Sequence, residues 1–223
     1  TLTPDEDVAK LVEKEKSKFK GNEIAGKTLG VIGLGAIGVR VCNAALALGM
    51  KVYGYDPFLS VKAAWMLSTE VKQSTSIDEM CKMCDFISVH VPLNDKTRNM
   101  IDEKQLDELK PTAVLLNMAR GGIINEEKAV EYLAEGKFAK YVVDFPSKTV
   151  INKKNVLAIP HLGASTDESE DNCAVMAANE LMDFLENGNI TNSVNLGTIT
   201  MPRSGEARIT IIHHNVPNML AQI

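Results

Sequence analysis

The chain has 223 residues, of which 45% are hydrophobic and 24% charged, and its formal net charge at pH 7 is −5. This length allows one large domain, or one domain with part of another, and the composition is that of an ordinary globular protein. The negative charge argues against nucleic acid as a partner, because no basic face would offset the repulsion of the phosphates. No apolar run is long enough to span a membrane, and the polar start of the sequence is unlike a signal peptide, so we expect no membrane partner.

The four cysteines show no disulfide-like spacing, which suits the reducing conditions of the cytoplasm. Cys81 and Cys84 form a CxxC motif, which can be a redox pair or one half of a zinc site. No second pair and no nearby histidine cluster completes a zinc site, so we expect no metal. We interpret the motif as one turn of a helix packed beside a strand, with a redox pair as the alternative.

The first predicted element is a helix over residues 5–20, because Val8, Leu11, Val12 and Phe19 are spaced for one apolar helical face. The segment is otherwise charged. We therefore expect a lead-in helix rather than a domain, followed by a loop that ends at Lys27.

The most informative pattern is strand, glycine turn, helix and strand over residues 28–56. Gly33 permits a sharp turn, Gly35 lets a pyrophosphate approach the backbone, and Gly38 lets the helix lie close to the strand. The helix N-terminus would then hold the phosphates, and Asp56 would accept hydrogen bonds from the adenosine ribose. A carboxylate there repels a 2′-phosphate and no arginine follows it, so we predict NAD rather than NADP. The alternative is a Rossmann-like turn without a ligand.

The next segments predict two short helices and a strand that ends in His90. The helix at 61–67 contains Trp65, which we expect to be a packing residue, and the helix at 76–82 begins with a capping box of Ser76 and Glu79. The strand at 85–90 ends before Pro92, which places His90 at the carboxyl edge of the sheet, where ligands bind in open α/β sheets. His90 could face a cofactor or be a structural histidine.

A helix at 103–109 and a strand at 113–117 lead to Arg120, which lies between the strand end and two glycines. An arginine held there is poorly explained as a solvated surface charge. Its planar fork suits bidentate binding of a carboxylate. We therefore favour a functional role for Arg120, such as binding a carboxylate, over a solvated surface charge.

The following helix, at 125–135, is capped by Asn125. Two further strands are predicted at 141–144 and 155–159. Asp144 ends the first, and His161 follows the second directly after Pro160. His161 could be a general base or a structural residue. A long helix then covers residues 167–187, and Ser165 with Glu168 is expected to form its capping box.

Short apolar strands alternate with helices throughout residues 28–187, which predicts an α/β fold of the Rossmann type with a doubly wound parallel sheet. The composition changes at Thr191. We predict a cofactor domain over 1–195, a linker over 196–207, and the truncated start of a further domain over 208–223. Residues 208–213 are expected to form its first strand, followed by a turn that opens a helix.

The motifs at residues 33–56, 90–93, 117–121 and 160–163, together with Asp144, resemble those of the D-isomer-specific 2-hydroxyacid dehydrogenases. Residues 161–166 and 192–195, with an ACT-like opening at 208–220, are most similar to the members that oxidise 3-phosphoglycerate to 3-phosphohydroxypyruvate with NAD in serine synthesis. The resemblance implies an ACT-like α+β domain that begins near residue 208, where serine can act as a feedback regulator. It also implies a homodimer or a higher homo-oligomer.

The resemblance also implies roles for individual residues. Arg120 would bind the substrate carboxylate, His161 would exchange the hydroxyl proton, and Asp144 would meet the nicotinamide end of the cofactor. The expected cofactor-binding residues are Gly33, Gly35, Ala36, Ile37, Gly38, Asp56, His90, Val91, Pro92, Thr97, Asn117, Ala119, Arg120, Asp144, His161 and Gly163.

Two departures from the family pattern stand out. No glutamate follows Asp144 at the usual spacing, so we expect His161 to lack a carboxylate partner, and the enzyme to be slower, unless another carboxylate reaches it. Only 26 residues precede Lys27, fewer than the roughly 50 of a small domain, so we expect a cofactor domain without its substrate domain. The alternatives are a nonenzymatic NAD(H)-responsive module similar to corepressors, and a dehydrogenase of another hydroxy acid such as glycerate.

Overall fold

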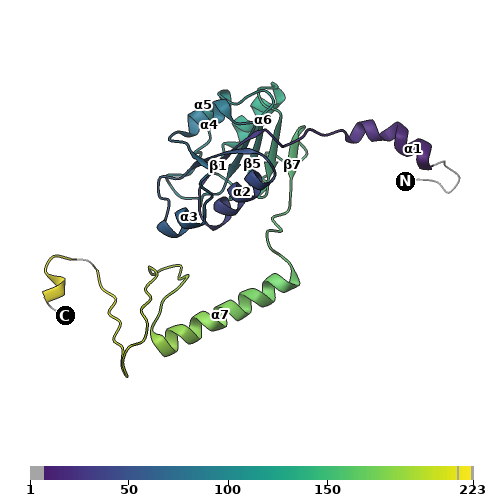
Figure 1. The fold of residues 1–223 in the computed structure, drawn as a ribbon. Helices are drawn as coiled ribbons and strands as arrows, with labels where there is room; N and C mark the ends of the chain where they lie inside the picture. The colour runs from purple at the N-terminus through teal and green to yellow at the C-terminus, as the bar shows by residue number, and fades with distance from the viewer. Residues whose placement is uncertain (1–7, 215, 222–223) are drawn as a thin grey trace. The chain divides into compact units, whose positions relative to one another are not determined.

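A parallel β-sheet forms the centre of the first of two units, residues 1–162, in the computed structural model, which describes residues 8–214 and 216–221 (Figure 1). Within these residues the sheet has seven strands in the order β3-β2-β1-β4-β5-β6-β7, and each neighbouring pair is parallel. The predicted doubly wound fold is confirmed. The strands are β1 (Thr28–Ile32), β2 (Lys51–Tyr55), β3 (Lys72–Gln73), β4 (Phe86–Val89), β5 (Val114–Asn117), β6 (Lys140–Val143) and β7 (Val156–Ala158).

Helices cover both faces of this sheet. On one face α2 (Ala36–Ala47) contacts β1 and β2, and α3 (Val61–Met66) contacts α2. On the other face lie α4 (Ile77–Met83), α5 (Glu103–Asp107) and α6 (Glu126–Ala134), as Figure 1 shows. The crossover from β3 to β4 changes the direction of winding, so the carboxyl ends of β1 and β4 diverge at a topological switch point.

Two apolar clusters hold the helices on the sheet. Successive residues of β1 point to opposite faces, so Val31 packs toward α2 with Val39, while Ile32 packs toward α4 with Met80. All four of these side chains are buried. Because both faces of the strands are covered, the strands are apolar almost throughout, which is why they could be identified in the sequence.

Polar side chains cap most of the helices, although two predicted capping boxes need correction. Ser76 accepts from the amide of Glu79, but its own amide donates to Ser74 Oγ at 3.4 Å rather than to Glu79. The long helix α7 (Asp167–Asn187) is capped by Thr166, one residue later than predicted, through a bond from the Ser169 amide.

The prediction that Trp65 packs in the core is wrong, because its side chain is 86% exposed on α3. The short edge strand β3 was not predicted. It has only two residues, both exposed, and pairs with β2 alone. A strand of this length has no hydrophobic period that sequence analysis could detect.

The lead-in segment forms α1 (Val8–Glu15) and a 3₁₀ turn, η1 (Lys16–Phe19), and neither has a buried residue. The predicted helix is therefore confirmed over Val8–Glu15, it ends earlier than predicted in the 3₁₀ turn, and its first residues lie outside those that the structure describes. Within the described residues, no helix combines the length and the apolar character needed to cross a bilayer.

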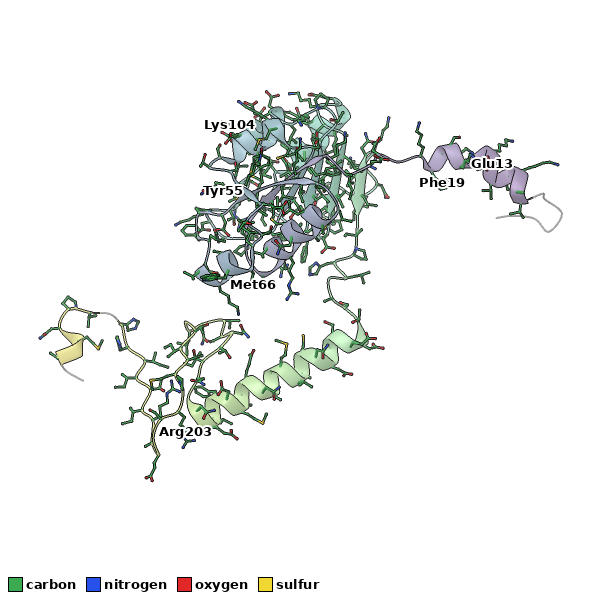
Figure 2. The ribbon with its side chains drawn as sticks, in the orientation of Figure 1. Glu13, Phe19, Tyr55, Met66, Lys104 and Arg203 are labelled. Atoms are coloured by element: carbon green, nitrogen blue, oxygen red, sulfur yellow. The ribbon has the colours of Figure 1, made fainter. Side chains whose placement is uncertain are left out.

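The second unit, residues 163–223, contains α7 and an irregular segment. Arg203 Nη1 donates to the carbonyl of Glu186 near the end of α7 (Figure 2), and Arg208 Nη1 donates to that of Asn187. Residues 208–213 form no strand, so that prediction is wrong, and the helix expected after them is a 3₁₀ turn, η2 (Met219–Ala221). The predicted domain boundaries at residues 195 and 207 stay predictions.

Candidate functional site

A cavity of about 290 Å³ lies at the carboxyl ends of β1, β2 and β4. This is the edge of a doubly wound sheet at which ligands bind. Seven of the predicted site residues line it, on three separate loops. The lining includes Gly33, Gly35, Asp56, Pro57, Phe58, His90, Val91, Pro92, Asn94, Lys96 and Thr97.

The glycine turn at one side of the cavity is fixed by the surrounding backbone. Gly33 has a φ of +92°, and a Cβ there would lie 2.7 Å from the His90 carbonyl oxygen. A Cβ on Gly38 would lie 1.9 Å from the Gly33 carbonyl oxygen, so the helix approaches the turn closely. A Cβ on Gly35 would meet no protein atom within 4 Å. The space beside Gly35 is therefore open for a ligand.

The first turn of α2 offers backbone donors toward this space. Gly35 is the N-cap residue and has no side chain to satisfy the first amides of the helix. The amides of Ala36 and Ile37 have no partner within an α-helix, and the helix dipole adds positive potential there. This arrangement suits the phosphates of a dinucleotide.

Asp56 follows β2, whose last residue is Tyr55 (Figure 2), and its carboxylate joins two loops. One oxygen accepts from the Leu34 amide at 2.8 Å, and the other accepts from the Phe58 amide at 2.8 Å. Each oxygen keeps lone pairs that can accept a ribose hydroxyl. The sequence analysis predicted the ribose role but missed the bonds that hold the carboxylate in place.

His90 presents a nitrogen without a partner among the described residues. Its Nε2 lies 2.8 Å from Ser88 Oγ, whereas its buried Nδ1 has no hydrogen-bond partner there. Burial lowers the pKa of His90 below its ordinary value, so the ring is neutral at pH 7. A buried polar atom of this kind on a cavity wall is suited to a ligand's hydrogen-bonding group.

Thr97 lines the same cavity, but its hydroxyl group is used within its own loop. Its Oγ1 donates to the Pro92 carbonyl at 2.6 Å and accepts from the Asn94 amide at 2.8 Å. Thr97 therefore shapes the wall that Pro92 presents to the cavity.

A second group of polar side chains follows β5, β6 and β7 at the same edge of the sheet. His161 Nδ1 lies 2.8 Å from Asp144 Oδ2, and the side chains are 44% and 11% exposed. The pair corrects the expectation that His161 lacks a carboxylate partner. Asp144 itself supplies the carboxylate, while Ser147, farther along the same loop, donates to Glu126 at 2.5 Å.

Phe145 contacts both predicted catalytic residues. Its ring centroid lies 3.7 Å from that of His161, and the Arg120 Cζ lies 4.7 Å from the Phe145 centroid. Arg120 also donates to the Ala119 carbonyl at 2.8 Å. The sequence analysis did not single out Phe145, although its position directly after Asp144 at a strand end was a usable indication.

Asn117, at the end of β5, braces the loop that carries Arg120. Its side chain donates to the Arg120 carbonyl at 2.9 Å and accepts from the Ala119 amide at 3.3 Å. Asn117 is only 1% exposed, so it supports the loop from its buried side. Gly163 belongs to the second unit and is not placed relative to these residues.

The CxxC motif takes no part in either group. Cys81 lies in α4 and Cys84 ends that helix, and a Cβ on Gly30 of β1 would lie 3.0 Å from the Cys84 Sγ. Burial raises the pKa of each thiol to about 12, so both are protonated at neutral pH. The interpretation as a helix turn packed beside a strand is confirmed.

Comparison with known proteins identifies a family. Residues 5–163 match the family described as D-isomer specific 2-hydroxyacid dehydrogenase, NAD binding domain. A D-3-phosphoglycerate dehydrogenase of Methanocaldococcus jannaschii is 38% identical over 202 residues, which are 88% of this chain and 38% of that protein. The enzyme of the same name from Escherichia coli is 32% identical over 212 residues, or 90% of this chain and 50% of that protein. The chain thus spans about half or less of the length of these relatives.

Solved structures of related enzymes share the fold. The NAD complex of a D-isomer specific 2-hydroxyacid dehydrogenase from Lactobacillus delbrueckii has a TM-score of 0.67 and 29% identity, over 76% of this chain and 56% of that one. The D-lactate dehydrogenase of Aquifex aeolicus, complexed with NAD and lactic acid, has a TM-score of 0.62 and 27% identity, over 80% of this chain and 61% of that one.

Proposed function

Because this chain belongs to the D-isomer specific 2-hydroxyacid dehydrogenases and carries their NAD-binding domain, we propose that it serves the NAD-dependent oxidation of 3-phospho-D-glycerate to 3-phosphohydroxypyruvate. One observation supports the proposal most strongly. The Asp144–His161 pair and Arg120 lie at the same edge of the sheet as the cofactor cavity. That edge thus combines groups for proton transfer, carboxylate binding and dinucleotide binding.

The cavity fits the adenosine side of NAD. The open space beside Gly35 and the amides of Ala36 and Ile37 suit the pyrophosphate, and Asp56 suits the ribose hydroxyls. His90, with its unpartnered Nδ1, adds a hydrogen-bonding group on the wall. When bound, NAD supplies the hydride acceptor for the oxidation.

His161 acts as the base in the proposed reaction. Its Nδ1 bonds to Asp144, which leaves Nε2 to take the proton from the substrate hydroxyl as the C–H hydrogen leaves as hydride. Asp144 holds the imidazole in this tautomer and stabilises the charged ring after proton uptake. In the reverse direction the same nitrogen returns the proton.

Arg120 binds the substrate carboxylate in the proposed reaction. Its guanidinium group can pair with a carboxylate through two parallel hydrogen bonds. This pairing orients the hydroxyl-bearing carbon between His161 and the cofactor, and it favours the negative charge that develops on the reacting oxygen.

The choice of substrate depends on the relatives. The curated proteins from Methanocaldococcus jannaschii and Escherichia coli are named D-3-phosphoglycerate dehydrogenase. A place in serine synthesis, serine binding by an ACT domain and assembly as a homodimer or a higher homo-oligomer belong to the same proposal, and their support is the resemblance of the sequence motifs. A cytoplasmic location is also part of the proposal, and its support is the cysteine spacing. The corepressor-like alternative rests on similarity to corepressors and on the missing glutamate, and the carboxylate of Asp144 beside His161 favours the enzyme.

The test is turnover by the complete protein. We expect NADH to form with 3-phosphoglycerate and NAD, and much less with glycerate, and we expect Arg120→Ala and His161→Ala to abolish it. Equal or better turnover of glycerate would replace the proposed substrate. If the protein bound NADH but oxidised neither acid, the enzymatic function would be contradicted.

A further inference from the structure

We propose that Phe145 is a positioning residue that holds the guanidinium of Arg120 and the imidazole of His161 against its ring. The proposal rests on the proposed function, because it assigns Phe145 a task in the same site. Its geometric basis is that one aromatic ring contacts both side chains, at 4.7 Å from Arg120 and 3.7 Å from His161.

The strand order explains how one ring can reach both residues. Arg120 follows β5, Phe145 follows β6 and His161 follows β7, and β6 is the middle strand of the three. Adjacent strands are about 4.8 Å apart, so a side chain at the end of the middle strand is flanked by those at the two neighbouring ends. The order of the strands therefore places Phe145 between the two groups.

Arg120 and His161 have few other constraints. Both lie outside regular secondary structure, and His161 has a φ of +46°, which few residues other than glycine adopt. The Arg120 side chain donates to the adjacent Ala119 carbonyl, and His161 is held by Asp144 through one ring nitrogen. A hydrogen bond at Nδ1 still allows the ring to swing, and a stacked aromatic ring limits that motion.

The contacts are attractive for both partners. A guanidinium group over an aromatic face is drawn to the negative face of the ring, and an imidazole gains the same attraction when it becomes charged. The attraction on the histidine side therefore increases during proton uptake, when the oriented ring is needed.

Phe145 has no evident task in the core. It belongs to neither of the two apolar clusters that hold the helices on the sheet, and it is only half-buried. Replacing it by leucine should therefore leave the fold intact. A substitution that keeps the fold but disturbs both Arg120 and His161 can be distinguished by experiment from one that unfolds the protein.

The first experiment tests the contact itself in the 223-residue chain by NMR. The ring of Phe145 should shift the carbon-bound imidazole protons of His161 upfield. We expect Phe145→Leu to abolish this shift and Phe145→Tyr to keep it. Phe19→Leu is the matched control, since Phe19 is 85% exposed in η1 (Figure 2), and it should change nothing. An unchanged His161 spectrum in Phe145→Leu would overturn the proposal.

The second experiment separates positioning from a purely structural role in the complete protein. We expect Phe145→Leu to lower kcat and raise the KM for the hydroxy acid, with a combined loss in kcat/KM of about 10- to 100-fold, while the Kd for NADH and the Tm stay unchanged. Phe145→Tyr should restore most of the loss. Full activity of Phe145→Leu would overturn the proposal, as would a loss that follows the Tm. Inactivity of the unmutated protein would contradict the proposed function, and the NMR result would still decide whether Phe145 contacts His161.

Discussion

Asp144 Oδ2 lies 2.8 Å from His161 Nδ1, and this contact joins the ends of β6 and β7. The two residues follow different strands, so the sequence alone does not show that their side chains meet. The pair provides what the sequence pattern was missing, a carboxylate that orients the proposed base. Its consequences can be tested directly.

Replacing Asp144 by asparagine should leave the shape of the site but remove the carboxylate. An amide can donate to Nδ1 as well as accept from it, so the imidazole can adopt the wrong tautomer, and a charged ring loses its stabilisation. We expect kcat to fall by about 10⁴-fold, as when the histidine base of a serine protease loses its orienting carboxylate. Steady-state kinetics with the complete protein provides the measurement.

The control for this variant is Glu126→Gln, which makes the same change of charge at a carboxylate bonded to Ser147 and Tyr141. It should keep its activity. If Asp144→Asn retained its activity, Asp144 would not be the orienting group.

Two glycine variants separate folding from cofactor binding. A Cβ on Gly38 would collide with the Gly33 carbonyl oxygen, so Gly38→Ala should lower the free energy of unfolding by about 1–3 kcal/mol and lose NADH binding. Gly35→Ala adds its Cβ in open space, so it should unfold like the unmutated chain but bind NADH more weakly. Urea unfolding and NADH titration measure the two effects, and unweakened NADH binding by Gly35→Ala would count against the cavity as the pyrophosphate site.

The stability of the fold should depend on pH through His90. Burial lowers the pKa of His90 in the folded state below its ordinary value of 6.5, so below about pH 6.5 the unfolded chain binds more protons than the folded one. The contribution of His90 to folding is therefore lost as the pH falls through this range, and His90→Gln should make stability depend less on pH there. His213→Gln, at an exposed histidine, is the matched control. Identical pH dependence in His90→Gln and the unmutated chain would contradict the burial of a neutral His90.

The thiols should differ sharply in reactivity. Cys173 is exposed, whereas Cys42, Cys81 and Cys84 are buried, and burial raises the pKa of each of these three to about 12. A thiol reagent should therefore modify one cysteine rapidly in the native chain and four in denaturant. Cys173→Ser should remove the rapid reaction. Rapid modification of Cys81 or Cys84 would revive the redox interpretation of the CxxC motif.

Much of the cofactor half of the site could be predicted from the sequence because it depends on local pattern. Strand, glycine turn and helix follow one another without interruption, and the steric demand at Gly38 arises within a short stretch of chain. The close approach of the His90 carbonyl to Gly33 comes from a distant part of the sequence and could not be derived from the pattern. The catalytic half depends on three strands that meet only in the folded sheet. Arg120, Asp144 and His161 could be named individually, but the Asp144–His161 bond and the Phe145 contacts could not be derived from their spacing.

The errors have physical causes as well. Residues 208–213 have the alternation of a strand, but a strand needs a partner for its backbone hydrogen bonds, and the described residues pair none with it. Trp65 lies in a short helix, and hydrophobic periodicity over so few residues does not show which side chains face the core. Its exposure could therefore not be predicted.

The most direct test of the central claim is a fluorescence titration of this chain with NADH, with NADPH as the competitor and Asp56→Ala as the variant. Saturable NADH binding that Asp56→Ala weakens by tenfold or more (about 1.4 kcal/mol), and that NADPH barely displaces, is the result expected if Asp56 holds the adenosine ribose. Asp107→Ala, which removes an exposed carboxylate bonded to Lys137, should bind NADH normally. If this chain did not bind NADH, or if NADPH competed equally well, the assignment of an NAD site to the cavity at Gly33, Gly35 and Asp56 would be contradicted.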